Sequence, residues 1–259
     1  MKIALLDSGI GLLAAAAALR RLRPDADLVL SSDPEGMPWG RTADNVTARA
    51  LACARAAAET RPDALIVACN TASVHALAAL RAELEPAVPV IGTVPAIKPA
   101  AAGGGAVAIW ATPATTGSAY QRRLIEEFGG AAVVTEVPCP GLAEAVQYAD
   151  DAAIDAAVAT AAALTPRDVR AVVLGCTHYE LVADRIRAAV QRPEGPAVTL
   201  LGSAEAVAAQ ALRRLGALAD PTAEPTGRLT VLLSGHPAEL PASALAYPEG
   251  RALGATASA

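Results

Sequence analysis

The stretch Ala64–Ser73, ALIVACNTAS, decides the fold prediction, together with a second stretch of the same design, Ala171–Glu180, AVVLGCTHYE. Each is an apolar run of strand length that ends at a cysteine and continues with small hydroxyl- or amide-bearing residues. A segment of helical character follows in both cases. The pattern predicts two strands that each carry one thiol, Cys69 or Cys176, to a strand end. Because the two cysteines lie far apart in sequence, any meeting between them must be tertiary.

Strands and helices alternate along the rest of the chain. Strand-like runs lie at 2–6, 27–31, 88–91, 106–110, 131–137, 197–201 and 229–233, and helical segments include 12–22, 43–59, 72–84, 119–128, 151–164 and 181–190. Such alternation predicts an α/β fold with mainly parallel sheets. The flexible stretch PAAAGGG, at 99–105, lies where the pattern restarts, so we expect a domain crossing there. The expected architecture is two similar α/β domains with a cleft between them, the usual place for a small ligand.

The composition excludes several classes of protein. The 259 residues are 53% hydrophobic, much of it alanine, and no run of about 18 residues is both strongly apolar and uncharged. The N-terminal MKIALLDSG reaches Asp7 after a run too short for the ~7–15-residue apolar region of a signal peptide. We therefore expect no membrane partner and a cytoplasmic location, where the four cysteines stay reduced. The net charge of −5, with scattered Lys and Arg, argues against a nucleic-acid partner.

The first predicted strand ends at the turn DSGIG, at 7–11, which leads into an alanine-rich helix. A strand–loop–helix opening of this kind places a ligand-binding crevice at the carboxyl end of the strand. A dinucleotide fingerprint starting at Gly9 needs glycine at position 14, where the chain has Ala14, so NAD binding is disfavoured. Asp7 is a candidate functional carboxylate, with capping of the following helix as the alternative.

Further candidates lie in two loops and one helix. The loop SDPEGMPWG, at 32–40, ends in a Pro-Trp-Gly tip that is either a rigid surface turn or part of a pocket wall. The loop ATPATTGS offers Thr112, Thr115 and Thr116 to hold a carboxylate, and capping of the next helix is the simpler alternative. Cys53 falls on the expected buried face of the helix at 43–59 and is interpreted as a core residue.

Three kinds of chemistry use Cys69, Cys176 and His178. These residues could ligate zinc, but no CxxC or HxxH pair accompanies them. A Cys–His hydrolase needs one cysteine and leaves the other unexplained. Acid–base chemistry at an sp³ carbon uses both, because one thiolate removes a proton from one face while the other thiol returns a proton to the opposite face. Asp7 beside Cys69 and His178 beside Cys176 would then adjust the protonation of the thiols. No lysine suggests a pyridoxal Schiff base, so we expect neither cofactor nor metal.

The motifs taken together resemble glutamate racemase, of the aspartate/glutamate racemase superfamily, over nearly the whole chain. In order they are DSGIG at 7–11, PWG at 38–40, ACNTAS at 68–73, ATPATT at 111–116, CPGL at 139–142, LGCTHY at 174–179 and LLSGHP at 232–237. ACNTAS and GCTHY carry most of the specificity. Aspartate racemases usually have Glu after Cys-Thr in the second motif, so His178 favours the glutamate branch.

The resemblance implies cofactor-independent interconversion of L- and D-glutamate, supplying D-glutamate for peptidoglycan, by a protein that commonly forms homodimers. It implies two flavodoxin-like three-layer domains, one at 1–97 plus 208–259 and one at 98–207, with the active site in the cleft between them. Cys69 and Cys176 become the two acid/base residues, assisted by Asp7 and His178. The residues implied to bind the substrate are Ser8, Pro38, Trp39, Gly40, Asn70, Thr71, Thr112, Thr115 and Thr177.

The chain departs from the family's usual motifs at four positions. Leu12 replaces a glycine, Trp39 replaces a tyrosine, Glu180 replaces a proline, and Gln147 replaces a glutamate that assists the histidine. Gln147 cannot carry charge, so His178 would lose an anionic partner at a cost of ~1–3 kcal/mol, enough to slow proton transfer about 10- to 100-fold. Two alternatives stay open: a superfamily member that acts on aspartate or another substrate, and a weakly active binding protein that retains the cleft.

Overall fold

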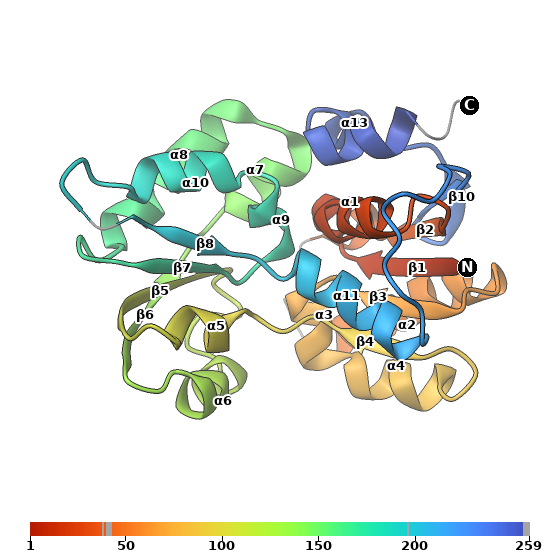
Figure 1. Ribbon diagram of the computed structural model, residues 1–259, viewed down its shortest axis with the longest axis horizontal. Coiled ribbons are helices and arrows are strands. Elements are labelled where there is room, and N and C mark those ends of the chain that lie inside the picture. The colour runs from red at the N-terminus through yellow and green to blue at the C-terminus, as the bar shows by residue number, and fades with distance from the viewer. Residues whose placement is uncertain (38, 40–42, 196, 256–259) are drawn as a thin grey trace. The chain divides into compact units, whose positions relative to one another are not determined.

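Two mostly parallel β-sheets with helices packed on them make up the computed structural model, which describes residues 1–37, 39, 43–195 and 197–255 (Figure 1). Met1–Val94 and Ala204–Ala259 form one unit, and Pro95–Ser203 form the other. The prediction of an α/β fold with mainly parallel sheets is confirmed.

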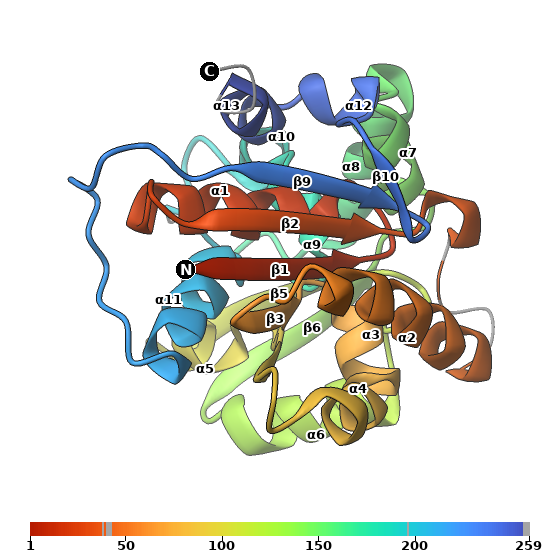
Figure 2. The same cartoon turned by 90° about the vertical axis from the view of Figure 1, so that its right-hand side faces the viewer.

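The sheet of the first unit has six strands in the order β10-β9-β2-β1-β3-β4 (Figure 2). The strands are β1 (Lys2–Asp7), β2 (Asp27–Ser32), β3 (Ala64–Val67), β4 (Val90–Gly92), β9 (Leu229–Leu233) and β10 (His236–Ala238). All neighbours run parallel except β10, which pairs antiparallel with β9. Residues 3–6 of β1 are fully buried, as expected of a strand covered on both faces.

Helices cover both faces of this sheet. They are η1 (Ile10–Leu12), α1 (Leu13–Leu22), η2 (Pro34–Gly36), α2 (Ala43–Glu59), α3 (Asn70–His75), α4 (Leu77–Leu84), α11 (Ala204–Arg214), α12 (Ala242–Leu245) and α13 (Pro248–Ala255). The crossover β1–α1–β2 runs toward one edge of the sheet and β2–α2–β3 runs back, so right-handed crossovers place α1 and α2 on opposite faces. Helix α1 packs against α11 and α13, and α2 packs against α3 and α4.

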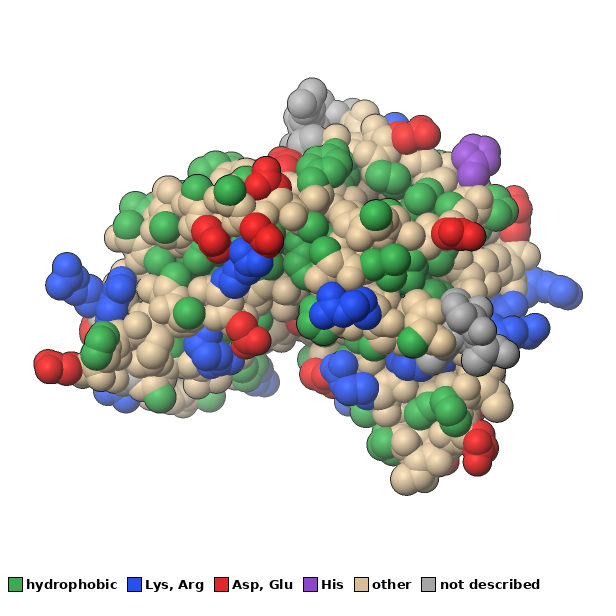
Figure 3. Space-filling model, turned by 90° about the horizontal axis from the view of Figure 1, so that it is seen from above, with side chains coloured by type: hydrophobic (Ala, Val, Ile, Leu, Met, Phe, Trp, Pro, Cys, Tyr) green, Lys and Arg blue, Asp and Glu red, His purple; other side chains and the backbone are tan. Residues whose placement is uncertain are grey.

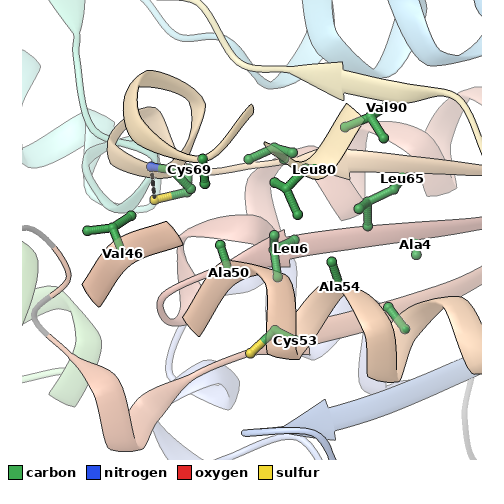
Figure 4. Close-up of a cluster of buried hydrophobic side chains, with 14 of the residues drawn as sticks. Ala4, Leu6, Val46, Ala50, Cys53, Ala54, Leu65, Cys69, Leu80 and Val90 are labelled. Atoms are coloured by element: carbon green, nitrogen blue, oxygen red, sulfur yellow. Dashed lines mark hydrogen bonds between the residues drawn. The ribbon is translucent and has the colours of Figure 1, made fainter. Parts of the chain in front are cut away.

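The core between α2 and the sheet consists of small and medium apolar side chains (Figure 4). Leu6 of β1 and Leu65 of β3 share one buried cluster with Val46 and Ala50 of α2, and alanine on the helix allows it to approach the sheet closely. Cys53 belongs to the same cluster, which confirms its interpretation as a core residue, and burial raises the pKa of its thiol to about 12.

The second unit contains four parallel strands in the order β6-β5-β7-β8. The strands are β5 (Gly105–Ala111), β6 (Ala132–Pro138), β7 (Ala171–Leu174) and β8 (Thr199–Leu201), and the helices are α5 (Ile97–Ala101), α6 (Ala119–Phe128), α7 (Leu142–Tyr148), α8 (Asp151–Leu164), α9 (Thr177–Glu180) and α10 (Ala183–Val190). Helices α5 and α6 pack on one face of this sheet, and α7, α8 and α10 lie over the other (Figure 1).

The two sheets share a strand order. In chain order, β2-β1-β3-β4 and β6-β5-β7-β8 both read second, first, third, fourth. In sheets of this kind a ligand binds outside the carboxyl ends of the first and third strands, where the direction of the crossovers reverses. Cys69 follows the third strand of its sheet, β3, and Cys176 follows β7, the third strand of the other. The internal repeat expected from the sequence is therefore present.

Several elements differ from the prediction. The helix expected at 72–84 is divided at Ala76 into α3 and α4, and the segment expected to be flexible at 99–105 begins inside α5. Pro99 is tolerated in α5 because the first turn of a helix needs no backbone donor, and Ile97 and Ala100 are buried. Strand β10 and helices α12 and α13 lack the strong periodic pattern that would have predicted them.

The surface mixes charges of both signs. On the face drawn in Figure 3, Lys and Arg side chains are interspersed with Asp and Glu. Within the described part of the chain, no helix is both long and apolar enough to span a membrane.

Candidate active site

Cys69 occupies the junction between β3 and α3. It is the N-cap residue of α3, with an extended backbone (φ −147°, ψ 120°), and its Sγ accepts a hydrogen bond from the backbone N–H of Ala72 at 3.5 Å (Figure 4). Cys69 is 5% exposed. A backbone N–H donor aimed at sulfur stabilises a thiolate more than a thiol.

Asp7 ends β1, the strand beside β3. It is fully buried, and its Oδ1 accepts from the backbone N–H of Ser8 at 2.6 Å and from the Ser8 hydroxyl at 3.3 Å. The N-cap residues of η1 and α1 are Gly9 and Leu12, and neither makes a side-chain cap hydrogen bond. Asp7 and Ser8 thus lie at the strand end next to the one that carries Cys69.

Asn70 follows Cys69 at the start of α3. Its side chain is 5% exposed, and neither its amide oxygen nor its amide nitrogen has a hydrogen-bond partner among the described residues. A buried amide without partners costs about 1–3 kcal/mol, so such a group is an indication of a ligand that would complete its bonds. Thr71, the next residue of α3, is partly exposed.

Cys176 repeats the geometry of Cys69 in the second unit. It is the N-cap residue of α9, directly after β7, with an extended backbone (φ −138°, ψ 134°) and 9% exposure. Its Sγ lies 3.9 Å from Nδ1 of His178, within hydrogen-bonding range for sulfur. Thr177, between them, is buried.

His178 links Cys176 to Gln147 of α7. Its Nε2 lies 3.1 Å from Oε1 of Gln147, and burial lowers the pKa of His178 to about 4. The imidazole is therefore neutral at neutral pH. An amide oxygen can only accept, so this hydrogen bond assigns the ring proton to Nε2 and leaves Nδ1 as an acceptor toward the Cys176 thiol. The partner of His178 is thus the uncharged side chain of Gln147, as expected from the sequence.

The threonines of the loop at 111–118 are not the cap of α6, contrary to the simpler expectation. Ser118 caps this helix by accepting from the backbone N–H of Gln121. Thr112 and Thr115 instead share a hydrogen bond between their hydroxyls at 3.3 Å, and the Thr116 hydroxyl donates to the carbonyl of Thr112. The loop directly follows β5, the strand next to β7.

The Pro-Trp-Gly tip is described only at Trp39, since Pro38 and Gly40 lie outside the described residues. Trp39 is 7% exposed, and its Nε1 donates to Oδ2 of Asp33 at 2.8 Å. Asp33 also accepts from Arg49 and from the Ser234 hydroxyl. Burial alone would raise the pKa of Asp33, but the hydrogen bonds from Arg49, Trp39 and Ser234 hold it below its ordinary value. The indole N–H of Trp39 is thus used in a hydrogen bond within the protein, to Asp33.

Sequence reasoning missed two residues that support this geometry. Asp33 joins the end of β2 to three separate segments, and the Ser-Asp pair before Pro-Trp-Gly is the only signal that could have indicated it. Tyr179 is fully buried and donates its hydroxyl to the carbonyl of Cys139 at 3.3 Å. The Cys139 thiol itself is buried, which raises its pKa to about 12 and makes it unsuited to acid–base work.

Metal ligands do not gather anywhere in the described residues, where no group of three His, Cys, Asp or Glu side chains could hold an ion. Each unit instead offers one thiol at the carboxyl end of a third strand, beside polar residues from the first strand or its loop. The fold and these two strand ends define a two-unit α/β protein in which each unit carries one thiol at the end of its third strand.

The chain belongs to the Asp/Glu/Hydantoin racemase family, whose pattern it matches over residues 11–211. It is 35% identical to a glutamate racemase of Roseiflexus sp. over 91% of this chain and 88% of that protein. It is 38% identical to a glutamate racemase of Granulibacter bethesdensis over 82% of this chain and 77% of that one. The crystal structure of Escherichia coli glutamate racemase with L-glutamate and the activator UDP-MurNAc-Ala superposes with a TM-score of 0.73 at 26% identity, covering 94% and 91% of the two chains.

These comparisons confirm the resemblance found in the sequence. They also confirm the predicted enzyme class, because the relatives named here are amino-acid racemases.

Proposed function

We propose that this protein interconverts L- and D-glutamate without a cofactor, with Cys69 and Cys176 as the two acid/base residues. The observation that carries the proposal is the matched placement of the two thiols, each an N-cap residue after the third strand of a sheet with the same strand order. A racemase that inverts a carbon needs one proton-transfer group for each face. The mechanism requires both thiols to reach the same α-carbon during turnover.

The two thiols take different roles in one direction of the reaction. Cys69, whose sulfur accepts the backbone N–H of Ala72, removes the α-proton as a thiolate. Cys176, whose sulfur faces Nδ1 of the neutral His178, returns a proton from its thiol. After one turnover the thiol and thiolate have exchanged places, and the reverse reaction starts from that state.

Polar groups at the strand ends would hold the substrate. The unpartnered amide of Asn70 supplies both a donor and an acceptor for the amino and carboxylate groups of an amino acid. The hydroxyls of Ser8, Thr71, Thr112, Thr115 and Thr177 are further candidates, with the tip at Pro38 and Gly40. Trp39 contributes by packing, because its N–H is bound to Asp33. Asp7 assists Cys69 from the neighbouring strand end.

The proposal extends to the cellular role. The product D-glutamate would be a building block for peptidoglycan, made in the cytoplasm, where the four free thiols stay reduced. A homodimer is the expected assembly.

Gln147 supports one alternative function within the family, with a different substrate. A neutral residue beside His178 is the departure that would accompany a change of substrate to aspartate or another amino acid. A weakly active binding protein is the second rival, although two matched thiols are not needed for binding alone.

Chiral chromatography of L-glutamate incubated with the purified, reduced protein tests the proposal, with no cofactor or metal added. We expect D-glutamate to form. Turnover of L-aspartate or another amino acid but not of glutamate would establish the first rival. Glutamate binding by calorimetry with no exchange of the α-proton into heavy water would establish the second.

A further inference from the structure

Glu180 links the segment that carries Cys176 to the end of the second unit by hydrogen bonds. Its Oε1 accepts from the backbone N–H of Ser203 at 2.8 Å and from the Ser203 hydroxyl at 2.9 Å. Ser203 is 4% exposed and is the last residue of the unit, since the chain joins the other unit at Ala204. Both of these bonds come from one residue at the crossing between units.

Gly202 leaves the space that this carboxylate needs. A Cβ at position 202 would lie 2.2 Å from Oε2 of Glu180, much closer than any real contact, and the backbone there does not need a positive φ. A larger residue at position 202 would thus displace the Glu180 carboxylate while leaving Glu180 itself unchanged. The absence of a side chain at Gly202 therefore leaves room for the Glu180 carboxylate to reach Ser203.

Helix α9 depends on such bonds because it is only four residues long. A single turn has little stability of its own, so tertiary contacts determine its orientation. Its residues bind three different elements: His178 binds Gln147 of α7, Tyr179 binds the carbonyl of Cys139 after β6, and Glu180 binds Ser203 after β8. Cys176 is the N-cap residue of this turn, so bonds that hold the turn also hold its thiol in place.

We propose that Glu180 is a positioning residue for Cys176, acting through its bonds to Ser203 at the crossing between the two units. The kinetic part of the inference rests on the proposed glutamate racemisation, whereas the positional part does not.

The reactivity of the Cys176 thiol tests the positional part without any turnover. The second-order rate of alkylation by iodoacetamide is measured for Cys176 by peptide mass spectrometry, with Cys69 in the same sample as the internal reference. In Glu180→Ala we expect Cys176 to react about tenfold faster, the effect of losing ~1.4 kcal/mol of hydrogen bonding, with Cys69 unchanged. Glu180→Gln keeps an acceptor oxygen and should lie between Glu180→Ala and the wild type.

Two further variants separate this role from a loss of charge or of folding. Gly202→Ala should reproduce the effect of Glu180→Ala, and it should add nothing in the double variant, where no carboxylate remains to be displaced. Asp184→Ala is the matched control, because Asp184 is an exposed acid in the first turn of α10. It should leave the alkylation of Cys176 unchanged.

Steady-state racemisation supplies the kinetic readout. In Glu180→Ala and Gly202→Ala, kcat should fall about tenfold while KM stays within about twofold, because the thiol is displaced but the substrate contacts remain. Cys176 alkylation in both variants within twofold of the Asp184→Ala value would overturn the proposal. If the wild type failed to racemise glutamate while the alkylation pattern held, the positioning role would stand and the proposed function would fall.

Discussion

Nε2 of His178 lies 3.1 Å from Oε1 of Gln147, and both side chains are buried. This bond sets the neutral tautomer with Nδ1 free to accept, and Nδ1 is the atom that faces Cys176. Burial lowers the pKa of His178, and Gln147 is the residue that its Nε2 contacts on the side away from Cys176.

Gln147→Glu should make this histidine a stronger base. A carboxylate at 3 Å favours the imidazolium, so the pKa of His178 should rise from about 4 toward its ordinary value, as measured by NMR titration of the ring Cε1–H. Racemisation should accelerate by about tenfold, since ~1.4 kcal/mol of added interaction corresponds to that factor. Gln147→Met, which removes the hydrogen bond, should slow it. A raised pKa with an unchanged or lower rate would mean that the site has been rebuilt around a neutral histidine.

Acid should destabilise the protein through His178. Its pKa is lowered from 6.5 to about 4 in the folded state, so the unfolded chain binds the extra proton between these values. The free energy of unfolding is then at its full value above pH 6.5 and declines as the pH falls toward 4, by up to roughly 3 kcal/mol. Urea unfolding of the wild type and of His178→Gln between pH 4.5 and 7.5 measures how the free energy of unfolding of each protein depends on pH. Parallel pH dependences in the two proteins would contradict it.

Asn70→Leu should separate stability from activity. Leucine has the same branched shape and no polar atoms, so removing an unpartnered buried amide should leave the free energy of unfolding unchanged or raise it by about 1–3 kcal/mol. In the same variant, kcat/KM should fall at least tenfold if the amide of Asn70 binds the substrate as proposed. A destabilised variant with full activity would show instead that Asn70 serves only the fold.

Trp39→Phe should destabilise the first unit by about 1–2 kcal/mol, because it removes a donor from the buried Asp33 carboxylate. Trp110→Phe is a matched control, since the Trp110 indole N–H donates at 2.9 Å to the neutral hydroxyl of Thr165 and should cost less. Urea unfolding gives both values. Equal losses would mean that the charge of Asp33 adds nothing to the bond from Trp39.

Much of the fold could be predicted because parallel strands are apolar throughout and helices are periodic. The predicted helices 43–59, 119–128 and 151–164 agree with the observed α2, α6 and α8. The same patterns could not predict β10, α12 or α13, because short elements owe their stability to tertiary contacts rather than to local sequence. The division at Ala76 has no local signal such as proline or glycine either.

The candidate site, like the fold, could be predicted only in part from the sequence. The apolar runs that end in cysteine predicted both cysteines at strand ends, whereas the His178–Gln147 pair was expected only from the family resemblance. Asp33 could not be predicted, since its partners Trp39, Arg49 and Ser234 come from distant parts of the chain. The bonds between Glu180 and Ser203 could not be predicted for the same reason, although Glu180 itself was identified as a departure from the usual motif.

Racemisation of L-glutamate in heavy water, stopped at low conversion, tests the two-thiol mechanism most directly. With two acid/base residues, the D-glutamate formed should carry deuterium at Cα while the remaining L-glutamate keeps its proton, and Cys69→Ser and Cys176→Ser should each abolish product formation. D-glutamate that retains the original proton, or wild-type racemisation by either serine variant, would contradict the account.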